Sequence, residues 1–191
     1  MLTEEHMIQG CKRGDPDAQE ALYKKYSSRM KMICLRYVRN SFDAEDLFHE
    51  SLIKIFNKIH TYSGQGSFSG WINSITVHTA IDYYHKENKL KNTNQEYGTS
   101  VDTGTGEEGD DQFKKIAAQL QVDDLLAIIN KLPEGYRMVF NLYAIENYSH
   151  KEISKLLHIS EGTSKSQLSK ARKHLKEWIL NHCLQENERS I

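Results

Sequence analysis

A basic, hydroxyl-rich run near the C-terminal end carries the clearest chemistry in this 191-residue sequence. Between residues 149 and 178 there are seven Lys or Arg side chains and three Asp or Glu side chains, a local charge of +4. Positive side chains attract phosphates, and amine and hydroxyl groups reach base edges. We therefore expect Lys165, Ser166 and Ser169 near base edges, and Thr163, Lys170, Arg172 and Lys173 on phosphates. The alternative is an amphipathic helix whose polar face meets only water.

The residues before this run predict a helix-turn-helix. Residues 149–152 read Ser-His-Lys-Glu, a capping box that starts a short helix. Residues 158–159 form the predicted turn, and Ser160 caps a final helix that runs from residue 161 toward residue 182. This arrangement presents its second helix to a major groove.

A second group of charged residues lies near the start of a helix predicted to begin close to Asp43. Its members share one side of that helix: Glu45, Asp46, His49, Glu50 and Ile53. This side has no basic residue before Lys54, which favours docking of a basic partner. A helix N-terminus enriched in acids for its dipole explains the same pattern equally well.

Residues 68–91 combine aromatic side chains with a basic end. They include Trp71, Tyr83 and Tyr84, followed by Lys86 and Lys89. Bases of single-stranded nucleic acid stack on rings while the backbone follows positive charge, so this stretch is a candidate strand-binding surface. We expect Trp71 in the core, whereas Tyr83 and Tyr84 fit either the core or a stacking role.

The elements that position these residues all read as helices. Apolar residues recur at helical spacing over residues 22–37, 47–59 and 68–83, and Asp15 precedes Pro16 as a helix start. Sustained period-two alternation is absent from the sequence. The fold class predicted is therefore all-α.

Charge divides the chain into two helical domains and a linker. Residues 92–112 have a net charge of −6 and consist almost wholly of small and polar residues, whereas residues 1–91 carry +2 and residues 113–191 carry +3. A segment with so little apolar surface cannot offset the entropy of ordering it. We expect a flexible acidic linker over 92–112 between domains at 1–91 and 113–191.

Composition narrows the function classes. The sequence has no apolar run long enough for a membrane helix and no secretory signal at its start. The three cysteines, Cys11, Cys34 and Cys183, lie far apart in the sequence and form no Cys-x-x-Cys pair. This spacing is typical of free cysteines in a reducing cytoplasm. The sequence contains no catalytic, metal-ligand or cofactor motif, so we expect a cytoplasmic protein that is not an enzyme and has no cofactor.

Taken together, the motifs of both blocks resemble a known family, the bacterial RNA polymerase sigma factors of the extracytoplasmic-function type. In the first block they are Gly14-Asp15 with Leu22-Tyr23-x-x-Tyr26, Asp43-Ala44-Glu45-Asp46-Leu47-x-x-Glu50, Phe68-x-x-Trp71-Ile72-x-x-Ile75 and Ala80-Ile81-Asp82. In the second they are Leu132-Pro133-Glu134-x-Tyr136-Arg137, Tyr148-Ser149-x-x-Glu152-Ile153 and Ser160-x-Gly162-Thr163-x-Lys165-Ser166-x-Leu168-x-x-Ala171-Arg172.

The resemblance implies core RNA polymerase, promoter DNA and an anti-sigma protein as partners. It places Asp43, Glu45, Asp46, His49 and Glu50 on the polymerase clamp. It places Ser67, Phe68, His78, Tyr83, Tyr84, His85, Lys86 and Lys89 at the melted −10 element. It places Tyr148 with the final helix at the duplex −35 element. A stand-alone helix-turn-helix regulator is the alternative, and such a protein has no need of a clamp-binding face.

The sequence departs from the family pattern at several of these positions. Family members commonly carry Gln at the position of His49, Asn at that of His78 and Arg at that of His85, and Ser164 and Gln167 replace a usual Val and Arg. The promoter sequence is therefore not transferred from relatives.

Overall fold

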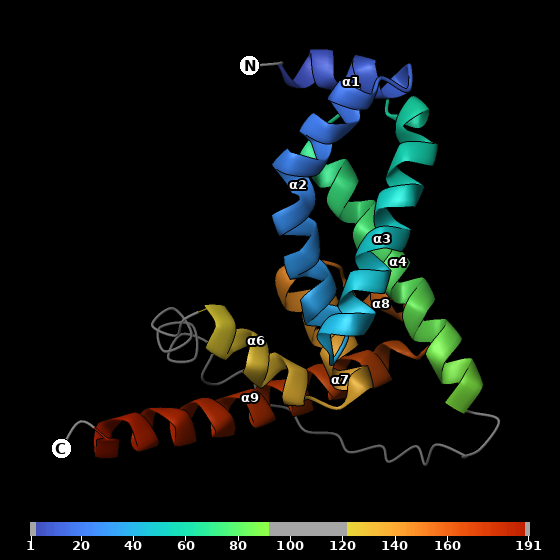
Figure 1. The fold of residues 1–191 in the computed structure, drawn as a ribbon. Coiled ribbons are helices and arrows are strands. Elements are labelled where there is room, and N and C mark those ends of the chain that lie inside the picture. Colours follow the sequence, from blue (N-terminus) through green and yellow to red (C-terminus); the bar gives the residue numbers. More distant parts are fainter. Residues whose placement is uncertain (1–2, 92–121, 190–191) are drawn as a thin grey trace. The chain divides into compact units, whose positions relative to one another are not determined.

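The computed structural model describes residues 3–91 and 122–189, and within these ranges every regular element is a helix (Figure 1). The chain divides into two compact units, Met1–Asn94 and Gln95–Ile191. The all-α prediction and the two-unit layout are confirmed. The predicted linker at 92–112 lies outside the described residues.

The first unit is a bundle of three long helices with a shorter helix across one end (Figure 1). The elements are α1 (Glu4–Lys12), α2 (Pro16–Tyr37), α3 (Ser41–Lys58), the short 3-10 helix η1 (Ile59–Thr61) and α4 (Phe68–Lys91). Helices α2, α3 and α4 contact one another pairwise, while α1 contacts α2 and η1. The loop between η1 and α4 is thereby held beside α1.

Two side-chain caps determine where the bundle helices begin. Asp15 accepts a hydrogen bond from the Asp17 N–H at 3.1 Å, with Pro16 as the first residue of α2, as expected. Asn40 accepts from the Asp43 N–H at 2.7 Å, so α3 begins at Ser41. The predicted start near Asp43 was therefore two residues late, because the cap is an asparagine outside the acidic run.

Helix α3 is buried over a wider face than its predicted apolar stripe. Leu47, Ser51 and Ile55 are buried as expected, but Phe48 is also fully buried. The ring of Phe48 meets that of Tyr23 edge-on, with ring centroids 6.0 Å apart. Because α3 packs against both α2 and α4, Phe48 adds one more buried position to this helix. The exposed acidic face of α3 is therefore narrower than predicted.

The second unit is built around the long helix α9. Its elements are α6 (Val122–Lys131), α7 (Glu134–Phe140), the π-helical segment η2 (Asn141–Ile145), α8 (His150–Leu157) and α9 (Glu161–Arg189). Helices α6, α7 and α8 each contact α9. The segment η2 continues α7 with the wider turn of a π-helix.

The helix-turn-helix forms as its local signals predict. Ser149 Oγ accepts from the Glu152 N–H at 3.3 Å, and the Glu152 carboxylate accepts from the Ser149 N–H at 2.8 Å, which completes the capping box. His158 adopts a left-handed conformation with φ of 55° and ends α8. Ser160 Oγ accepts from the Thr163 N–H at 2.9 Å and starts α9.

Candidate protein and nucleic-acid interfaces

The outer face of α3 combines acidic and apolar side chains in water. Phe42 is 75% exposed and Ile53 is 61% exposed, and the exposed side chains of Asp46 and His49 lie between them along the helix. Phe42 and Ile53 are the two most exposed large apolar side chains among the described residues, and both lie on this face. Sequence reasoning missed Phe42, which precedes the acidic run and looks like core by residue type alone.

Several of the predicted clamp-binding carboxylates are engaged within the unit. The Glu45 carboxylate lies 3.0 Å from Lys31 Nζ of α2 and 3.6 Å from His49 Nε2. Asp43 accepts from the Asn40 side-chain amide at 2.8 Å. Asp46 forms no hydrogen bond or ion pair with another described residue, which makes it the carboxylate most available to a partner.

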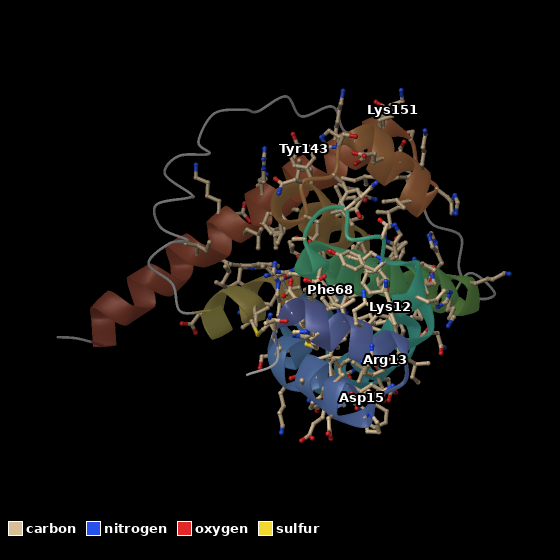
Figure 2. All side chains as sticks on the ribbon, turned by 90° about the horizontal axis from the view of Figure 1, so that it is seen from above. Lys12, Arg13, Asp15, Phe68, Tyr143 and Lys151 are labelled. Carbon is tan, nitrogen blue, oxygen red and sulfur yellow. The ribbon has the colours of Figure 1, made fainter. Side chains whose placement is uncertain are left out.

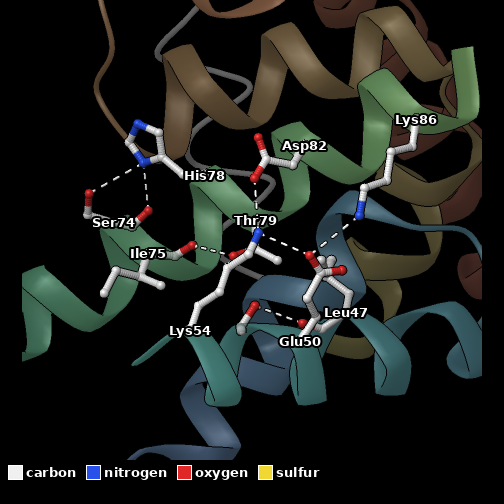
Figure 3. A network of polar contacts seen from close by, with 10 residues as sticks. Leu47, Glu50, Lys54, Ser74, Ile75, His78, Thr79, Asp82 and Lys86 are labelled. Carbon is white, nitrogen blue, oxygen red and sulfur yellow. Dashed lines mark hydrogen bonds and ion pairs between the residues drawn. The ribbon is translucent and has the colours of Figure 1, made fainter. Parts of the chain in front are cut away.

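Glu50 belongs to an ion-pair network that joins α3 to α4 (Figure 3). Lys54 Nζ lies 3.0 Å from Glu50 and donates to Asp82 Oδ2 at 2.9 Å, while Lys86 Nζ lies 3.6 Å from Glu50. Burial alone would lower the pKa of Lys54, but the two carboxylates outweigh it and the pKa is raised. The acidic face of α3 therefore has a basic neighbour on another helix, Lys86 of α4, that the sequence of α3 alone does not reveal.

The same network involves a residue predicted to hold DNA. Lys86 was expected on the strand backbone, and here its ammonium group lies beside Glu50, a predicted polymerase contact. One carboxylate thus stands between the two predicted surfaces of the first unit. Any phosphate that binds Lys86 must compete with Glu50.

The loop between η1 and α4 is held by hydrogen bonds at both ends. The buried Tyr62 donates its hydroxyl to the Gly66 carbonyl at 2.9 Å, and Ser67 Oγ accepts from the Gly70 N–H at 3.0 Å at the start of α4. Gly64 and Gly66 have φ of +82° and +74°, a conformation that glycine adopts without strain. The loop is exposed from residue 63 to residue 67.

Phe68 packs against the aromatic residues that flank this loop. The predicted contact of Phe68 with DNA is wrong, because its side chain is buried. Its side chain is 1% exposed, stacked on Trp71 at a centroid distance of 5.6 Å and edge-on to Tyr62 at 5.0 Å. A ring enclosed in this way offers no face to a base. Trp71 is only half-buried, so the core position expected for it is partly open to solvent.

The remaining predicted −10 residues lie along α4. His78 is exposed, and its Nδ1 lies 2.7 Å from the Ser74 carbonyl, so that nitrogen carries the proton (Figure 3). Tyr83 and Tyr84 are half-buried, as is His85, whose ring lies 5.7 Å from that of Tyr84. Lys89 is exposed one turn beyond. The last two turns of α4 thus offer partly accessible rings beside positive charge.

In the second unit, the N-terminal half of α9 carries the predicted DNA-binding residues. Lys165 and Lys173 are exposed, and Lys170 is half-buried; within the described residues none of the three lysines forms an ion pair. Thr163 shares a hydrogen bond with Ser160, and Ser166 donates to the Thr163 carbonyl at 3.0 Å. Ser169 is half-buried on the same helix.

A stack of side chains fixes α8 and η2 against α9. The ring of Tyr143, which is labelled in Figure 2, stacks on that of His150 with a centroid distance of 4.4 Å. The Arg172 guanidinium lies 5.9 Å from the centroid of the Tyr143 ring. His150 Nδ1 and the Ser164 hydroxyl, which is fully buried, are 2.9 Å apart. Sequence reasoning missed this stack because His150 reads only as a capping-box position.

Burial and charge set the protonation of two groups at this end of the unit. The pKa of His150 is lowered by its burial and by the positive charges of Lys165 and Arg172, against a smaller opposing effect of Glu161. The pKa of Tyr148 is raised by burial and by nearby Glu146 and Glu152. Both side chains are therefore neutral near pH 7, and neither adds charge to the basic surface.

Family models match both units of the chain. The model for sigma-70 region 2 matches residues 22–90, and the model for sigma-70 region 4 matches residues 114–175. The chain therefore belongs to the sigma-70 family, as an RNA polymerase sigma factor of the extracytoplasmic-function group. It acts in promoter-directed initiation of transcription with core RNA polymerase and promoter DNA as partners, in a family of factors that are not enzymes.

Curated relatives cover nearly all of the sequence. The chain is 25% identical to the ECF RNA polymerase sigma-E factor of Haemophilus influenzae over 93% of this chain and 96% of that one. It is 27% identical to SigW of Bacillus subtilis over 90% and 94%. It is also 26% identical to SigE of Mycolicibacterium smegmatis over 85% of this chain, where it spans 62% of the relative's length.

Among solved structures, the sigma factor RpoE of Bartonella quintana, crystallised with the anti-sigma factor NepR, has a similar fold. The TM-score is 0.50 at 18% identity, and the match covers 85% of this chain and 96% of that one. Within the described residues, no helix is long and apolar enough to cross a lipid bilayer. The same ranges hold no cluster of three His, Cys, Asp or Glu side chains fit to bind a metal.

Proposed function

We propose that the first unit binds the polymerase clamp and the melted −10 element, while the second unit reads the −35 element as duplex. The observation that carries this division is the contrast between two surfaces. One is the mixed acidic and apolar face of α3, with Asp46 unpaired among described residues and Phe42 exposed. The other is the basic start of α9, presented by a capped helix-turn-helix.

The face of α3 suits a basic protein surface better than it suits DNA. Its carboxylates repel phosphates, and Phe42 and Ile53 gain from burial against another protein. Asp46 stands between them on the same face and supplies the charge complementarity. Asp43, Glu45 and Glu50 contribute from positions where they already have partners within the unit.

For the −10 element, the exposed loop at 63–67 and the adjoining turns of α4 form the proposed contact. Capture of one unpaired base offsets part of the stacking energy lost when DNA opens. The loop and His78 would border that base, while Tyr83, Tyr84 and Lys89 follow the strand. Ser67 contributes through the cap that fixes the loop to α4.

For the −35 element, α9 enters the major groove by its first turns. Lys165 reaches a base edge, and Lys170, Arg172 and Lys173 hold phosphates on either side. The Arg172 guanidinium is already oriented by the ring of Tyr143. A helix set in place before DNA arrives loses less entropy on binding.

An anti-sigma protein is a further proposed partner of this chain. The solved RpoE of Bartonella quintana was crystallised with the anti-sigma factor NepR, which gives a precedent in a protein of similar fold. In this chain Phe42 and Ile53 offer exposed apolar anchors that such a partner would cover. The protein acts in this scheme in the cytoplasm, where the polymerase is found.

The proposal is tested by run-off transcription with core polymerase on genomic fragments, together with co-purification of the two proteins. Asp46→Ala should weaken binding to core polymerase about tenfold and leave promoter-fragment binding by the free chain unchanged, as expected for loss of one interface anchor. Glu5→Ala, which removes an exposed carboxylate from α1, is the matched control. Equal loss of polymerase and DNA binding in Asp46→Ala, or a wild-type chain that never joins the polymerase, would contradict the proposed division.

A further inference from the structure

A lysine of α1 holds the loop that we propose reads the −10 element. Lys12 Nζ donates a hydrogen bond to the Tyr62 carbonyl at 2.8 Å, and this contact is partly buried. The two residues are 50 positions apart, so the contact joins the first helix to the start of the loop. The family-model match begins at residue 22 and does not include α1.

Helix α1 is itself anchored firmly enough to act as a fixed support. The helix buries three of its own side chains, those of Met7, Ile8 and Cys11. A Cβ built at Gly10 would lie only 2.4 Å from the Cβ of Ala18, so α1 and α2 approach too closely there for any side chain. Glu4 receives hydrogen bonds from Tyr26 at 2.6 Å and from Lys25 at 2.7 Å.

The Tyr62 peptide is the point where support matters most. Its carbonyl is held by Lys12, its N–H donates to Ile59 at 3.2 Å, and its hydroxyl crosses the loop to Gly66. Between these fixed points, Gly64 and Gly66 leave the backbone free to adopt other conformations. Removal of the Lys12 contact therefore takes away the one of these three hydrogen bonds that ties the start of the loop to α1.

We propose that Lys12 is a positioning residue for −10 recognition: it fixes the loop conformation that selects the captured base. The inference rests on the proposed function of the loop. It extends that function to a residue outside the bundle surface that meets DNA. Lys12 touches no base in this scheme, and its effect passes through the Tyr62 carbonyl.

The first test needs no polymerase and no promoter. Hydrogen exchange of the Tyr62 and Gln65 amides, the N–H groups that are hydrogen-bonded at the start of the loop and within it, is compared in the full chain for wild type, Lys12→Met and Lys12→Arg. Lys12→Met keeps the length of the side chain but removes the donor, so we expect exchange about tenfold faster, the effect of losing one hydrogen bond from a charged donor. Lys12→Arg should restore most of the protection.

Lys25→Met is the matched control, because it removes another lysine contact that involves α1 and leaves the loop untouched. Its loop amides should exchange as in wild type. If Lys25→Met accelerates the loop as much as Lys12→Met does, general docking of α1 controls the loop and the proposal is wrong. Unchanged exchange in Lys12→Met also overturns it.

The second test measures base selection by the holoenzyme on a promoter found by run-off transcription. Each −10 position is substituted in turn on a fork-junction DNA with an unpaired non-template strand, and the −35 element is substituted as a reference. Lys12→Met should lose about tenfold in discrimination at one −10 position and none at −35. Polymerase binding should stay unchanged.

The outcomes separate this inference from the proposed function. Faster loop exchange with unchanged base selection at every −10 position shows that the loop does not select a base, which rejects the positioning role in recognition. Equal losses at −10 and −35 also reject it. If the wild-type holoenzyme ignores −10 substitutions altogether, the proposed function itself has failed, whatever the exchange data show.

Discussion

The two units differ in whether the charged side chains of their proposed binding surfaces form ion pairs within the protein. In the first, Glu45 of α3 pairs with a lysine of α2, and Glu50 of α3 pairs with Lys86 of α4. In the second, Lys165 and Lys173 stand exposed on α9 without an ion pair in the described residues. A phosphate that approaches α9 meets lysines ready to bind, whereas one that approaches the end of α4 must displace a carboxylate. We infer that the proposed duplex-reading surface is formed in advance and that the proposed strand-binding surface is partly masked.

The largest expected effect follows from the unmasked surface. Lys165→Ala should lower promoter-directed transcription and duplex binding about tenfold or more, because it removes the base-edge contact that we propose for this lysine. Lys165 is exposed, so the stability of the second unit should not change. Run-off transcription and thermal unfolding check both expectations.

Lys176→Ala is the control for this variant, since it removes an exposed lysine further along α9. A comparable loss in both variants would mean that α9 attracts DNA only by net charge, and the contrast between the units would then lose its second half.

An intermediate effect concerns the support of α9 and depends on pH. The pKa of His150 is lowered, so the folded unit takes up a proton there less readily than the unfolded chain. The contribution of neutral His150 to the stability of the second unit is fully present above about pH 6.5, the ordinary pKa of histidine. This contribution is lost as the pH falls through the lowered pKa. His150→Gln should therefore make stability less dependent on pH between 7 and 5.

Unfolding of the second unit can be followed by fluorescence of Trp178 once Trp71→Phe has removed the other tryptophan of the chain. The midpoint temperature is compared between pH 7 and pH 5 with and without His150→Gln. His158→Asn, which suits the left-handed turn, controls for loss of a histidine in the same unit. An unaltered pH slope in His150→Gln would show that the stack around Tyr143 tolerates a charge.

The smallest expected effect belongs to the masked surface. Glu50→Gln leaves Lys54 its contact with Asp82 but removes the carboxylate beside Lys86. Binding of a single-stranded oligonucleotide by the full chain should rise about twofold at low salt, since exposed ion pairs are weak, and the gain should vanish at high salt.

Glu20→Gln breaks an ion pair with Lys24 that lies within α2 and serves as the control. Fluorescence anisotropy at two salt concentrations measures both variants. Should Glu50→Gln weaken strand binding, the network would be organising Lys86 instead of masking it, and the comparison between the units would have to be reversed.

Sequence reasoning located the elements whose signals are local. The capping box at Ser149, the turn at His158 and the cap at Ser160 each depend on residues within a few positions, and all three formed as expected. The all-α class followed from helical periodicity for the same reason. Local signals also placed the basic residues of α9 on one exposed helix.

Contacts between distant residues were the part that the sequence did not reveal. Burial of Phe68, the pairing of Glu50 with Lys86 and the contact of Lys12 with Tyr62 all depend on how helices pack. A composition or spacing pattern carries no information about such neighbours. Phe42 was overlooked for a related reason, because only its position on α3 shows that its ring faces water.

The left-handed residue at His158 has a consequence for how such a chain changes its target. One backbone corner sets the course of α9, and the cap at Ser160 and the buried Ser164 hold it there. None of these residues needs to touch a base. Exposed side chains such as Lys165 can therefore be exchanged while the helix axis stays fixed, so a new set of genes could come under this protein through a few surface substitutions.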